Sequence, residues 1–375
     1  MKILINLNTS WNAYNFRKEL IIRLLKEGFK VYVLAPFDPY STKLEKLGVI
    51  FIDVKINPNG INPFTDFKLI KDYFQAIKKI NPDVILSYTI KPNIYGNFAA
   101  RILRIPIINN ISGLGTLFIK SNYISYIGKL LYKLSLKFGT HVFFQNQDDR
   151  NLFIKENLIT ASKSSVILGS GVNTTFFKSQ RTSNPGKRFL FVGRLLKDKG
   201  VIEYLDASLN VLNIHPEKEF LLVGEMGYKN NTALNKSNLE HYLNISPQIK
   251  YLGKTDDIKS LLNSVDIMVL PSYREGLSKS LLEAASMTLP IITTNVPGCR
   301  EVVKHGYNGL LCKSKSQSSL EKAMIDMISL PEKTRHSMGV NGRLRIIENF
   351  SNSIVIDNYL QRIKTIYKNN IHSKI

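Results

Sequence analysis

The strongest constraint on the fold is an alternation of short β-rich runs with amphipathic segments, which occurs twice along the chain. In the first half, the segments between the runs have apolar residues at helical spacing, as in FRKELIIRLLKEG and NIYGNFAARILR. The strand-like runs are KILINLN, VYVLAP, DVILSY, PIIN, HVFFQN and SVILG. Strands that alternate with helices predict a parallel sheet covered on both faces, which places the chain in the α/β class.

A second set of strands follows the polar stretch 179–187 and predicts a second domain of the same kind. These runs are FLFVGR, FLLVGE, IKYLG, DIMVLP and PIITT. A chain of 375 residues is too long for one ordinary core and fits two domains. We therefore expect domains at 1–175 and 176–355, and a terminal helix at 356–375 that packs near the first domain. Ligands of such sheets bind beyond the carboxyl ends of the strands.

The charge balance favours an anionic partner. Lys and Arg outnumber Asp and Glu by 51 to 29, a formal charge of +22, which suits a phosphate ligand, an acidic membrane or nucleic acid. The amino terminus lacks the apolar core of a signal peptide, and no stretch reaches the roughly 20 apolar residues that cross a bilayer, so we expect a cytoplasmic protein.

Nothing in the composition calls for a metal ion or another cofactor. Cys299 and Cys312 are too few for a disulfide framework or a zinc site, and we expect them to be ordinary residues near strand ends. The sequence also has no Asp-x-Asp pair and no histidine cluster. We therefore expect no metal in the site.

The segment YREGLSKSLLEA, residues 273–284, is typical of a nucleotide-sugar site. It follows the strand-like DIMVLP, and Ser278 can cap a helix that carries Glu283, while Gly276 and Glu275 lie in the preceding turn. The free backbone N–H groups at a helix start suit a phosphate, and carboxylates accept hydrogen bonds from sugar hydroxyls. As the alternative, two glutamates at this spacing also occur on a solvated helix face.

A second group of polar residues lies in FVGRLLKDKG. A strand stops at Gly193, and Arg194 and Lys199 follow it. A diphosphate needs compact positive charge, which Arg supplies as a fork of donors and Lys as a mobile point charge. Taken singly, these residues could be surface charges. Their place after the first strand of the second sheet, with the glutamate segment after a later strand, favours binding of a ligand.

In these motifs the chain resembles the glycosyltransferases of family 4, which have the GT-B architecture of two Rossmann-like parallel-sheet domains facing a cleft. The resemblance covers nearly the whole chain. It includes residues 87–116 (SYTIKPNIYGNFAARILRIPIINNISGLGT), VFFQNQDDRNLF, ILGSGVNTTFF and NVPGCREVVKHGYNGLL as well as the two motifs above. It is close to bacterial transferases that add a hexosamine, commonly N-acetylgalactosamine, to an undecaprenyl-diphosphate-linked sugar during assembly of a surface polysaccharide (O-antigen or capsule) or glycan.

The resemblance implies roles for individual residues. Arg194 and Lys199 would hold the donor diphosphate, Glu275 the hydroxyls of the donor sugar and Glu283 the ribose, with Glu275, Arg194 and Lys199 as the catalytic groups. The other donor-binding residues that it implies are Gly193, Glu225, Leu252, Gly276, Leu277, Ser278 and Lys279. The alternative for these seven is that they belong to ordinary loops that join strands to helices.

Two departures from the family pattern concern the acceptor side. The segment NTSWNAYNFR, residues 8–17, lacks the glycine pair of the family's amino-terminal loop, so we expect Asn12, Asn15 and Arg17 to shape that side. Ser112 precedes Gly113 where many members have a histidine, which argues against an imidazole-based step. If the reaction retains the anomeric configuration, as the resemblance implies, the departing diphosphate oxygen accepts the proton of the attacking hydroxyl, and the protein supplies positioning and charge stabilisation.

The segment 117–138 is typical of a helix that lies on a membrane. Lys129, Lys133 and Lys137 recur at i, i+4 on one side. On the other side we expect the apolar residues Ile124, Ile127, Leu131 and Leu134, with Tyr123, Tyr126 and Tyr132 interleaved. A basic, aromatic, amphipathic helix can lie among lipid headgroups, although a plain surface helix has a similar pattern.

Together these features predict a peripheral transferase on the inner face of the cytoplasmic membrane. We expect it to bind a UDP-sugar, UDP-N-acetylgalactosamine or a close relative, in the second domain and a polyprenyl-diphosphate-linked glycan against the first. Two alternatives remain: a nucleotide-sugar epimerase of the same fold and a nucleic-acid-binding protein. We expect no nucleic-acid partner, because the basic residues are spread through both domains and no recognition module is present.

Overall fold

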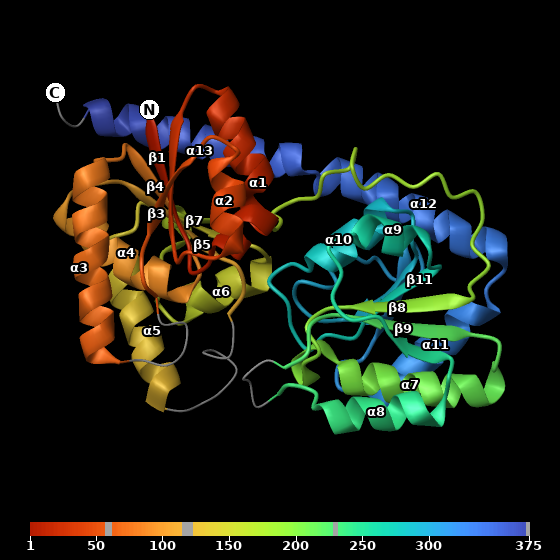
Figure 1. Ribbon diagram of the computed structural model, residues 1–375. Coiled ribbons are helices and arrows are strands. Elements are labelled where there is room, and N and C mark those ends of the chain that lie inside the picture. The colour runs from red at the N-terminus through yellow and green to blue at the C-terminus, as the bar shows by residue number, and fades with distance from the viewer. Residues whose placement is uncertain (57–61, 115–122, 228–231, 373–375) are drawn as a thin grey trace. The chain divides into compact units, whose positions relative to one another are not determined.

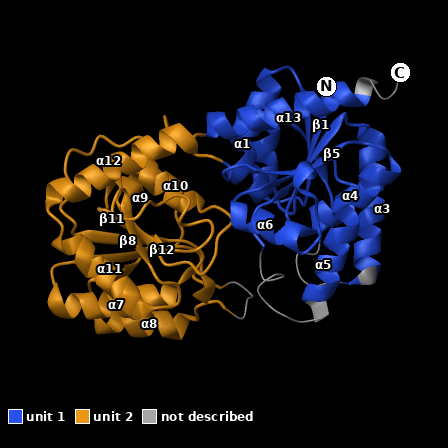
Figure 2. Ribbon diagram, turned by 180° about the vertical axis from the view of Figure 1, so that it is seen from behind, with its two compact units in different colours: residues 1–170, 352–375 blue, residues 171–351 orange. Residues whose placement is uncertain are grey.

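The computed structural model describes residues 1–56, 62–114, 123–227 and 232–372 and divides into two compact units. Unit 1 comprises residues 1–170 and 352–375, and unit 2 comprises residues 171–351 (Figure 2). The sequence analysis placed these boundaries at 175/176 and 355/356. The terminal helix is thus part of unit 1, because the chain returns to the first sheet after completing the second.

In the described residues, unit 1 is built on a seven-stranded parallel sheet with the order β3-β2-β1-β4-β5-β6-β7. Its strands are β1 (Lys2–Asn6), β2 (Lys30–Ala35), β3 (Ile50–Asp53), β4 (Val84–Tyr88), β5 (Ile107–Ile111), β6 (His141–Phe144) and β7 (Ser164–Val166). The sequence analysis identified all of these except β3, which has only four residues and is partly exposed at the sheet edge.

Helices cover both faces of this sheet (Figure 1). One face carries α3, α4 and α5, and the other carries α1, α2 and α13, each over its own apolar cluster. The helices of unit 1 are α1 (Ser10–Lys26), α2 (Pro39–Glu45), α3 (Pro63–Ile80), α4 (Ile90–Ile102), α5 (Tyr123–Leu136), α6 (Gln147–Lys155) and α13 (Asn352–His372), with a short 3₁₀ turn, η1 (Ala161–Lys163). The helix α13 packs along α1 because Val355, Tyr359 and Ile363 form a buried stripe within the first cluster.

In the described residues, unit 2 is built on a six-stranded parallel sheet with the order β10-β9-β8-β11-β12-β13. Its strands are β8 (Arg188–Val192), β9 (Glu219–Val223), β10 (Ile249–Tyr251), β11 (Ile267–Leu270), β12 (Ile291–Thr294) and β13 (Gly309–Cys312). Its helices are η2 (Lys197–Lys199), α7 (Val201–Ile214), α8 (Lys236–Ile245), α9 (Ile258–Asn263), α10 (Lys279–Ser286), α11 (Gln317–Ser329) and α12 (Glu332–Asn349). The prediction of an α/β fold with two Rossmann-like sheets is confirmed.

The order of strands in unit 2 reverses direction between β8 and β11. Ligands of open α/β sheets bind at the carboxyl ends of the strands where the strand order reverses in this way. Both motifs that the sequence analysis singled out follow these two strands.

Candidate active site

The loops after β8 and β11 are joined by hydrogen bonds. The backbone N–H of Tyr273 donates to the carbonyl of Asp198 at 2.9 Å, and the Ser272 hydroxyl donates to the same carbonyl at 3.2 Å. Gly200 permits this approach, because a Cβ there would lie 2.1 Å from the carbonyl oxygen of Pro271. The two loops are therefore joined to each other at the edge formed by the carboxyl ends of β8 and β11, where the strand order reverses.

This edge brings together two of the predicted catalytic side chains, Lys199 and Glu275. Their Nζ and Oε1 atoms form an ion pair, and the Ser272 hydroxyl donates to the same Oε1 at 2.8 Å. The Lys199 side chain is 20% exposed and the Glu275 side chain 12% exposed, so the pair is largely shielded from water but still partly accessible. The sequence analysis assigned these residues to different parts of the ligand and did not predict their contact.

The loop after β12 holds the backbone on both sides of the Glu275 turn by hydrogen bonds. The Glu275 N–H donates to the Pro297 carbonyl at 3.0 Å, and the Ser278 N–H donates to the Gly298 carbonyl at 3.0 Å. A Cβ on Gly298 would lie 2.4 Å from the Glu275 carbonyl oxygen. Sequence reasoning missed this supporting turn, although its Pro-Gly pair is a recognisable signal of one.

Helix α10 begins at the residue that the sequence analysis expected. Ser278 is its N-cap, and the Ser278 hydroxyl accepts from the Leu281 N–H, so that prediction is confirmed. Glu283 is only 8% exposed, and its Oε1 lies 3.3 Å from the Nζ of Lys279. Burial raises the pKa of Glu283 above its usual range, and the neighbouring Lys279 opposes that rise. Gly276 and Leu277 lie in the turn between Glu275 and the cap.

Arg194 lies on the same edge of the sheet, directly after β8. The adjoining Gly193 N–H donates to the Val223 carbonyl at 3.0 Å, which holds the end of β8 against β9. Leu195 and Leu196 are buried, and Arg194 is exposed. Arg194 is therefore an exposed cation at the carboxyl end of the sheet, and a guanidinium suits a phosphate ligand.

The ends of β9 and β10 complete this edge with Glu225 and Leu252. The Gly224 N–H donates to the Gly253 carbonyl at 2.9 Å, and a Cβ on Gly224 would lie 1.8 Å from the Gly193 carbonyl oxygen. Glu225 is exposed, and its Oε2 lies 3.9 Å from the Nζ of Lys254. Leu252 is 49% exposed. The predicted donor-binding residues thus follow the carboxyl ends of four strands of unit 2, β8, β9, β10 and β11, and some of them, such as Glu283, are buried.

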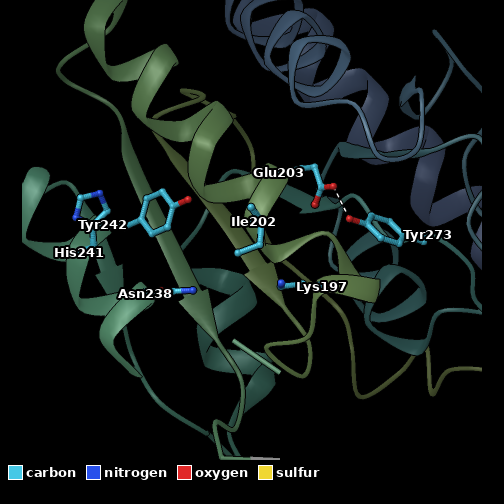
Figure 3. Close-up of a pocket in the computed structure, with 7 residues that line it drawn as sticks. All are labelled: Lys197, Ile202, Glu203, Asn238, His241, Tyr242 and Tyr273. Atoms are coloured by element: carbon cyan, nitrogen blue, oxygen red, sulfur yellow. Dashed lines mark hydrogen bonds between the residues drawn. The ribbon is translucent and has the colours of Figure 1, made fainter. Parts of the chain in front are cut away.

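A pocket of about 470 Å³ opens beside the Lys199 turn (Figure 3). Its lining residues are Lys197, Ile202, Glu203, Asn238, His241, Tyr242 and Tyr273. The Tyr273 hydroxyl donates to a carboxylate oxygen of Glu203, and the pKa of Tyr273 is raised by burial and by this carboxylate. The hydrogen bond fastens the glutamate loop to the first turn of α7. Sequence reasoning missed the pocket because its residues come from four separate segments.

In unit 1, the predicted amino-terminal loop is wrong in part. The sequence analysis expected the helix from Phe16, but α1 begins at Ser10, because the Thr9 hydroxyl caps it by accepting the Asn12 N–H at 3.0 Å. Asn12 and Asn15 are therefore helical, and the Asn15 amide donates to the Trp11 carbonyl at 3.0 Å. Arg17 is only 3% exposed, with its guanidinium carbon 4.1 Å from the centre of the Tyr88 ring.

Ser112 and Gly113 directly follow β5. The Ser112 hydroxyl donates to the side-chain oxygen of Asn110 at 2.9 Å, and the Asn110 amide donates to the hydroxyl of Tyr359 at 2.7 Å. Gly113 has a φ of +127°, a conformation that favours glycine. The predicted acceptor loop is thus connected to the terminal helix α13 by two successive hydrogen bonds.

The predicted pattern of α5 needs correction. Lys129 pairs with Glu156 at 2.9 Å, whereas Lys133 and Lys137 are exposed. Tyr132 is buried in the core, and Leu134 is 48% exposed, so the apolar side differs from the expected one. Alternating steps of three and four residues along the helix had grouped Leu134 with the buried positions. The side chains of Tyr123 and Ile124 lie outside the described residues, as do residues 117–122.

Three further expectations concern cysteines, metals and membrane spans. Cys299 and Cys312 are free and buried, and burial raises the pKa of each thiol to about 12. Within the described ranges, no three His, Cys, Asp or Glu side chains gather as metal ligands. The same part of the chain contains no helix with the length and apolar character to cross a bilayer.

The chain matches two family models and several characterised proteins. The model described as glycosyl transferase 4-like covers residues 2–146, and the one described as glycosyl transferases group 1 covers residues 172–345. The chain is 31% identical to an N,N'-diacetylbacillosaminyl-diphospho-undecaprenol alpha-1,3-N-acetylgalactosaminyltransferase of Campylobacter jejuni, over 96% of this chain and 97% of that relative. It is 26% identical to a UDP-Gal:alpha-D-GlcNAc-diphosphoundecaprenol alpha-1,3-galactosyltransferase of Escherichia coli, over 82% and 81% of the two chains.

Among solved structures, HepE of Anabaena in complex with UDP superimposes with a TM-score of 0.81 at 18% identity, over 97% of this chain and all of that one. The two Rossmann-like sheets have the architecture of the GT-B class, and the matches to glycosyltransferase models and relatives make the protein a sugar-transferring enzyme. The protein belongs to the glycosyltransferases of family 4, as the match along almost its whole length shows.

Proposed function

We propose that the protein transfers a hexose or N-acetylhexosamine, preferably N-acetylgalactosamine, from a UDP-sugar to an undecaprenyl-diphosphate-linked saccharide, with retention of configuration. The observation that carries the proposal is the meeting of Lys199 and Glu275 at the switch point of unit 2. The sugar and the acceptor named for the Campylobacter relative support the choice of substrates. The product would belong to a bacterial surface polysaccharide, such as O-antigen or capsule, or to a related glycan.

In this proposal different side chains of unit 2 bind different parts of the donor. The Lys199 ammonium has three N–H donors, of which one is directed to Glu275, leaving others for the oxygens of the diphosphate. The second oxygen of Glu275 accepts from hydroxyls of the donor sugar, and Glu283 accepts from the ribose. Arg194 adds a second cation at the same edge. Fixed cations stabilise the charge that develops on the departing diphosphate, and we propose that they do so without a metal ion.

The acceptor is proposed to bind at the carboxyl edge of the unit 1 sheet. Asn12 and Asn15 lie on the first turns of α1, after β1, while Ser112 and Gly113 follow β5. Amide and hydroxyl groups at these places suit the polar saccharide. Because Arg17 is buried against Tyr88, we propose that it contributes to acceptor binding through the position of α1. The attacking hydroxyl passes its proton to the departing diphosphate oxygen.

A panel of sugar nucleotides tests this function. Each would be incubated with the protein and a lipid-linked saccharide in detergent, and the product identified by mass. We expect UDP release and a product one sugar heavier only when donor and acceptor are both present. An epimerase would instead change the donor sugar without an acceptor, and that result would contradict transfer. Binding of random RNA that persists near physiological salt would favour the nucleic-acid alternative.

Replacement of Glu283 by glutamine should weaken UDP binding by roughly 10- to 100-fold, because hydrogen bonds to a charged acceptor contribute more than neutral ones. Its raised pKa means that the carboxylate gains its proton at a higher pH in the fold than in the unfolded chain. Stability from this group is therefore present at low pH and is lost as pH rises between the two pKa values. UDP affinity should change the opposite way and fall with decreasing pH, since ribose binding needs the carboxylate.

Calorimetric titration of UDP over a pH series measures both effects. Glu283→Gln should remove the part of the pH dependence that comes from this carboxylate, while the exposed Glu240→Gln on α8 serves as a matched control with unchanged binding. UDP binding in Glu283→Gln with the affinity and pH profile of the wild type would contradict the ribose assignment.

We also propose that unit 1 contacts an anionic membrane surface through α5. Lys133 is exposed on this helix, and Lys137 is exposed in the turn directly after it. Basic residues near an anionic surface each contribute about 1 kcal/mol. Lys133→Glu/Lys137→Glu should therefore reduce co-sedimentation with phosphatidylglycerol vesicles by roughly tenfold or more. The control is Lys236→Glu/Lys322→Glu, which reverses two exposed lysines of unit 2. Equal binding by the two double variants would count against a membrane role for α5.

A further inference from the structure

Two phenylalanines at the start of α3 are exposed to an unusual degree. Phe64 is 89% exposed and Phe67 is 73% exposed, and in the described residues these are the largest values for any large apolar side chain. Single exposed apolar residues are common and need no explanation, but two adjacent aromatic rings on one helical turn form a patch that water solvates poorly. The sequence analysis did not identify this patch.

The local structure fixes both rings on the outside. The Asn62 side chain caps α3 by accepting the Phe64 N–H at 3.1 Å, and Asp66 accepts the Asn62 N–H at 3.2 Å. Asp66 also pairs with Lys91 of α4 at 2.8 Å, and both of these side chains are nearly buried. The inner side of this turn is thus occupied by an ion pair, and both rings lie on the outer side.

The inner stripe of α3 is already complete. It consists of Leu69, Tyr73, Ile77 and Ile80, all buried in the apolar cluster under α3, α4 and α5. The outer stripe continues from the two rings at helical spacing through exposed polar residues: Lys68, Lys71, Gln75 and Lys78. The helix therefore has two separate faces: one fills the core, and the other has an aromatic tip followed by a row of lysines.

The position of α3 leaves this outer stripe accessible within unit 1. Figures 1 and 2 show α3 at the outer edge of the layer that it forms with α4 and α5. It follows the carboxyl end of β3, as α4 follows that of β4. Its aromatic tip therefore lies toward the carboxyl ends of the strands, where Ser112 and Gly113 follow β5. A lipid whose sugar reaches that loop would keep its hydrocarbon chain in the bilayer next to this edge.

We propose that the outer face of α3, which we call the α3 face (Phe64, Phe67, Lys68, Lys71 and Lys78), docks on an anionic lipid bilayer. Phe64 and Phe67 enter the boundary between headgroups and acyl chains, and the lysines contact headgroup phosphates. An apolar tip beside a row of cations matches the layered chemistry of such a surface. The inference rests on the proposed use of a lipid-linked acceptor, and it adds an inserting element to the electrostatic contact of α5.

Vesicle partition of the full chain tests the proposal directly. Phe64→Ser/Phe67→Ser should partition at least about tenfold more weakly than the wild type into mixed phosphatidylethanolamine and phosphatidylglycerol vesicles. The reason is that the variant lacks the two rings that the wild type buries in the bilayer. Ile102→Ser is the matched control, since Ile102 is 65% exposed near the end of α4 in the same layer. Partition of the double variant like that of the wild type, or an equal loss in Ile102→Ser, would overturn the docking role of the α3 face.

A transfer assay in detergent separates this proposal from the proposed function. With a detergent-dissolved lipid-linked acceptor, Phe64→Ser/Phe67→Ser should keep the wild-type rate, because docking is no longer needed. Absence of transfer by the wild type would contradict the proposed function and leave the vesicle result to decide the docking. Loss of transfer in detergent by the double variant alone would overturn docking as the role of the two rings.

A fluorescent variant measures insertion itself. Trp11 is the only tryptophan of the chain, so Trp11→Phe/Phe64→Trp gives one fluorophore at the tip of α3 and keeps its apolar bulk. We expect acyl-brominated phosphatidylglycerol in the vesicles to quench its emission and aqueous iodide to quench it less than in solution. Unchanged emission with brominated lipid, under conditions where the variant is bound, would show that the tip stays outside the acyl boundary and overturn the insertion.

Discussion

Replacing Lys199 with alanine is expected to lower turnover by roughly 10²- to 10³-fold, the effect of removing one preorganised electrostatic contact to a developing charge. Lys199 is held to Glu275 at the switch point of unit 2, and Glu275 is itself fixed by Ser272 and by the Pro297 carbonyl. The ammonium therefore needs little reorganisation when the diphosphate departs. Loss of this cation should affect the chemical step more than the binding of UDP.

The measurement is a comparison of kcat and KM for Lys199→Ala with the same constants for Lys197→Ala. Lys197 is an exposed cation in the same short turn, so its removal changes the net charge equally without removing the ion pair. Full activity in purified, folded Lys199→Ala would contradict its catalytic assignment. Thermal melts of both variants would show whether any loss of turnover reflects unfolding instead.

A double-mutant cycle adds a test of the contact itself. Glu275→Ala should also lose most turnover, and the double variant Lys199→Ala/Glu275→Ala should lose much less than the product of the two single effects. Substitutions of residues in direct contact have non-additive effects on the free energy, whereas the fold-changes in turnover from substitutions of distant residues multiply. Independent effects of the two substitutions would show that the ion pair seen in the structure has no part in the reaction.

The hydrophobic pattern of the sequence predicts the fold well, because the apolar residues that make up the pattern also form the core. Continuous apolar runs such as FLFV at β8 are buried in a parallel sheet, so they are recognisable without knowledge of their neighbours. The strands that the sequence analysis missed, β3 and β13, are four residues each and lie at the edges of their sheets. The early start of α1 depends on local hydrogen bonds at its first turn, from the Asn12 N–H to the Thr9 hydroxyl and from the Trp11 N–H to Asp38, which the hydrophobic spacing does not indicate.

The composition of the site can be predicted only in part, because a motif indicates which residues take part but not which of them are in contact. The sequence indicated Lys199 and Glu275, but these residues are 76 positions apart, and their pairing depends on the order of strands in the sheet. The same limit applies to the hydrogen bond from Tyr273 to Glu203, which no local pattern contains. Exposure is also a property of the folded surface. The spacing along α3 is that of an amphipathic helix, and only the structure shows that its first aromatic residues lie outside.

Gly200→Ala should be among the most damaging single substitutions in unit 2. Gly200 has a φ of +73°, and an added Cβ would lie 2.1 Å from the Pro271 carbonyl oxygen, far inside van der Waals contact. The backbone strain of a non-glycine residue in this conformation costs roughly 1–2 kcal/mol. Relief of the clash requires the two loops to separate, which adds roughly 1–3 kcal/mol as in other overpacked sites. Separation would also break the contact between Lys199 and Glu275, so turnover should fall even in the folded fraction.

Gly306→Ala separates strain from clash. Gly306 has a nearly equal φ of +75°, but no atom lies within 4 Å of an added Cβ there. Urea denaturation of the two variants should therefore show a loss for Gly306→Ala limited to roughly 1–2 kcal/mol of backbone strain. Its transfer rate should match that of the wild type, because the loop of Gly306 lies outside the two joined loops. Equal destabilisation by the two alanines, with transfer retained in Gly200→Ala, would mean that the close approach at Pro271 does not hold the catalytic pair together.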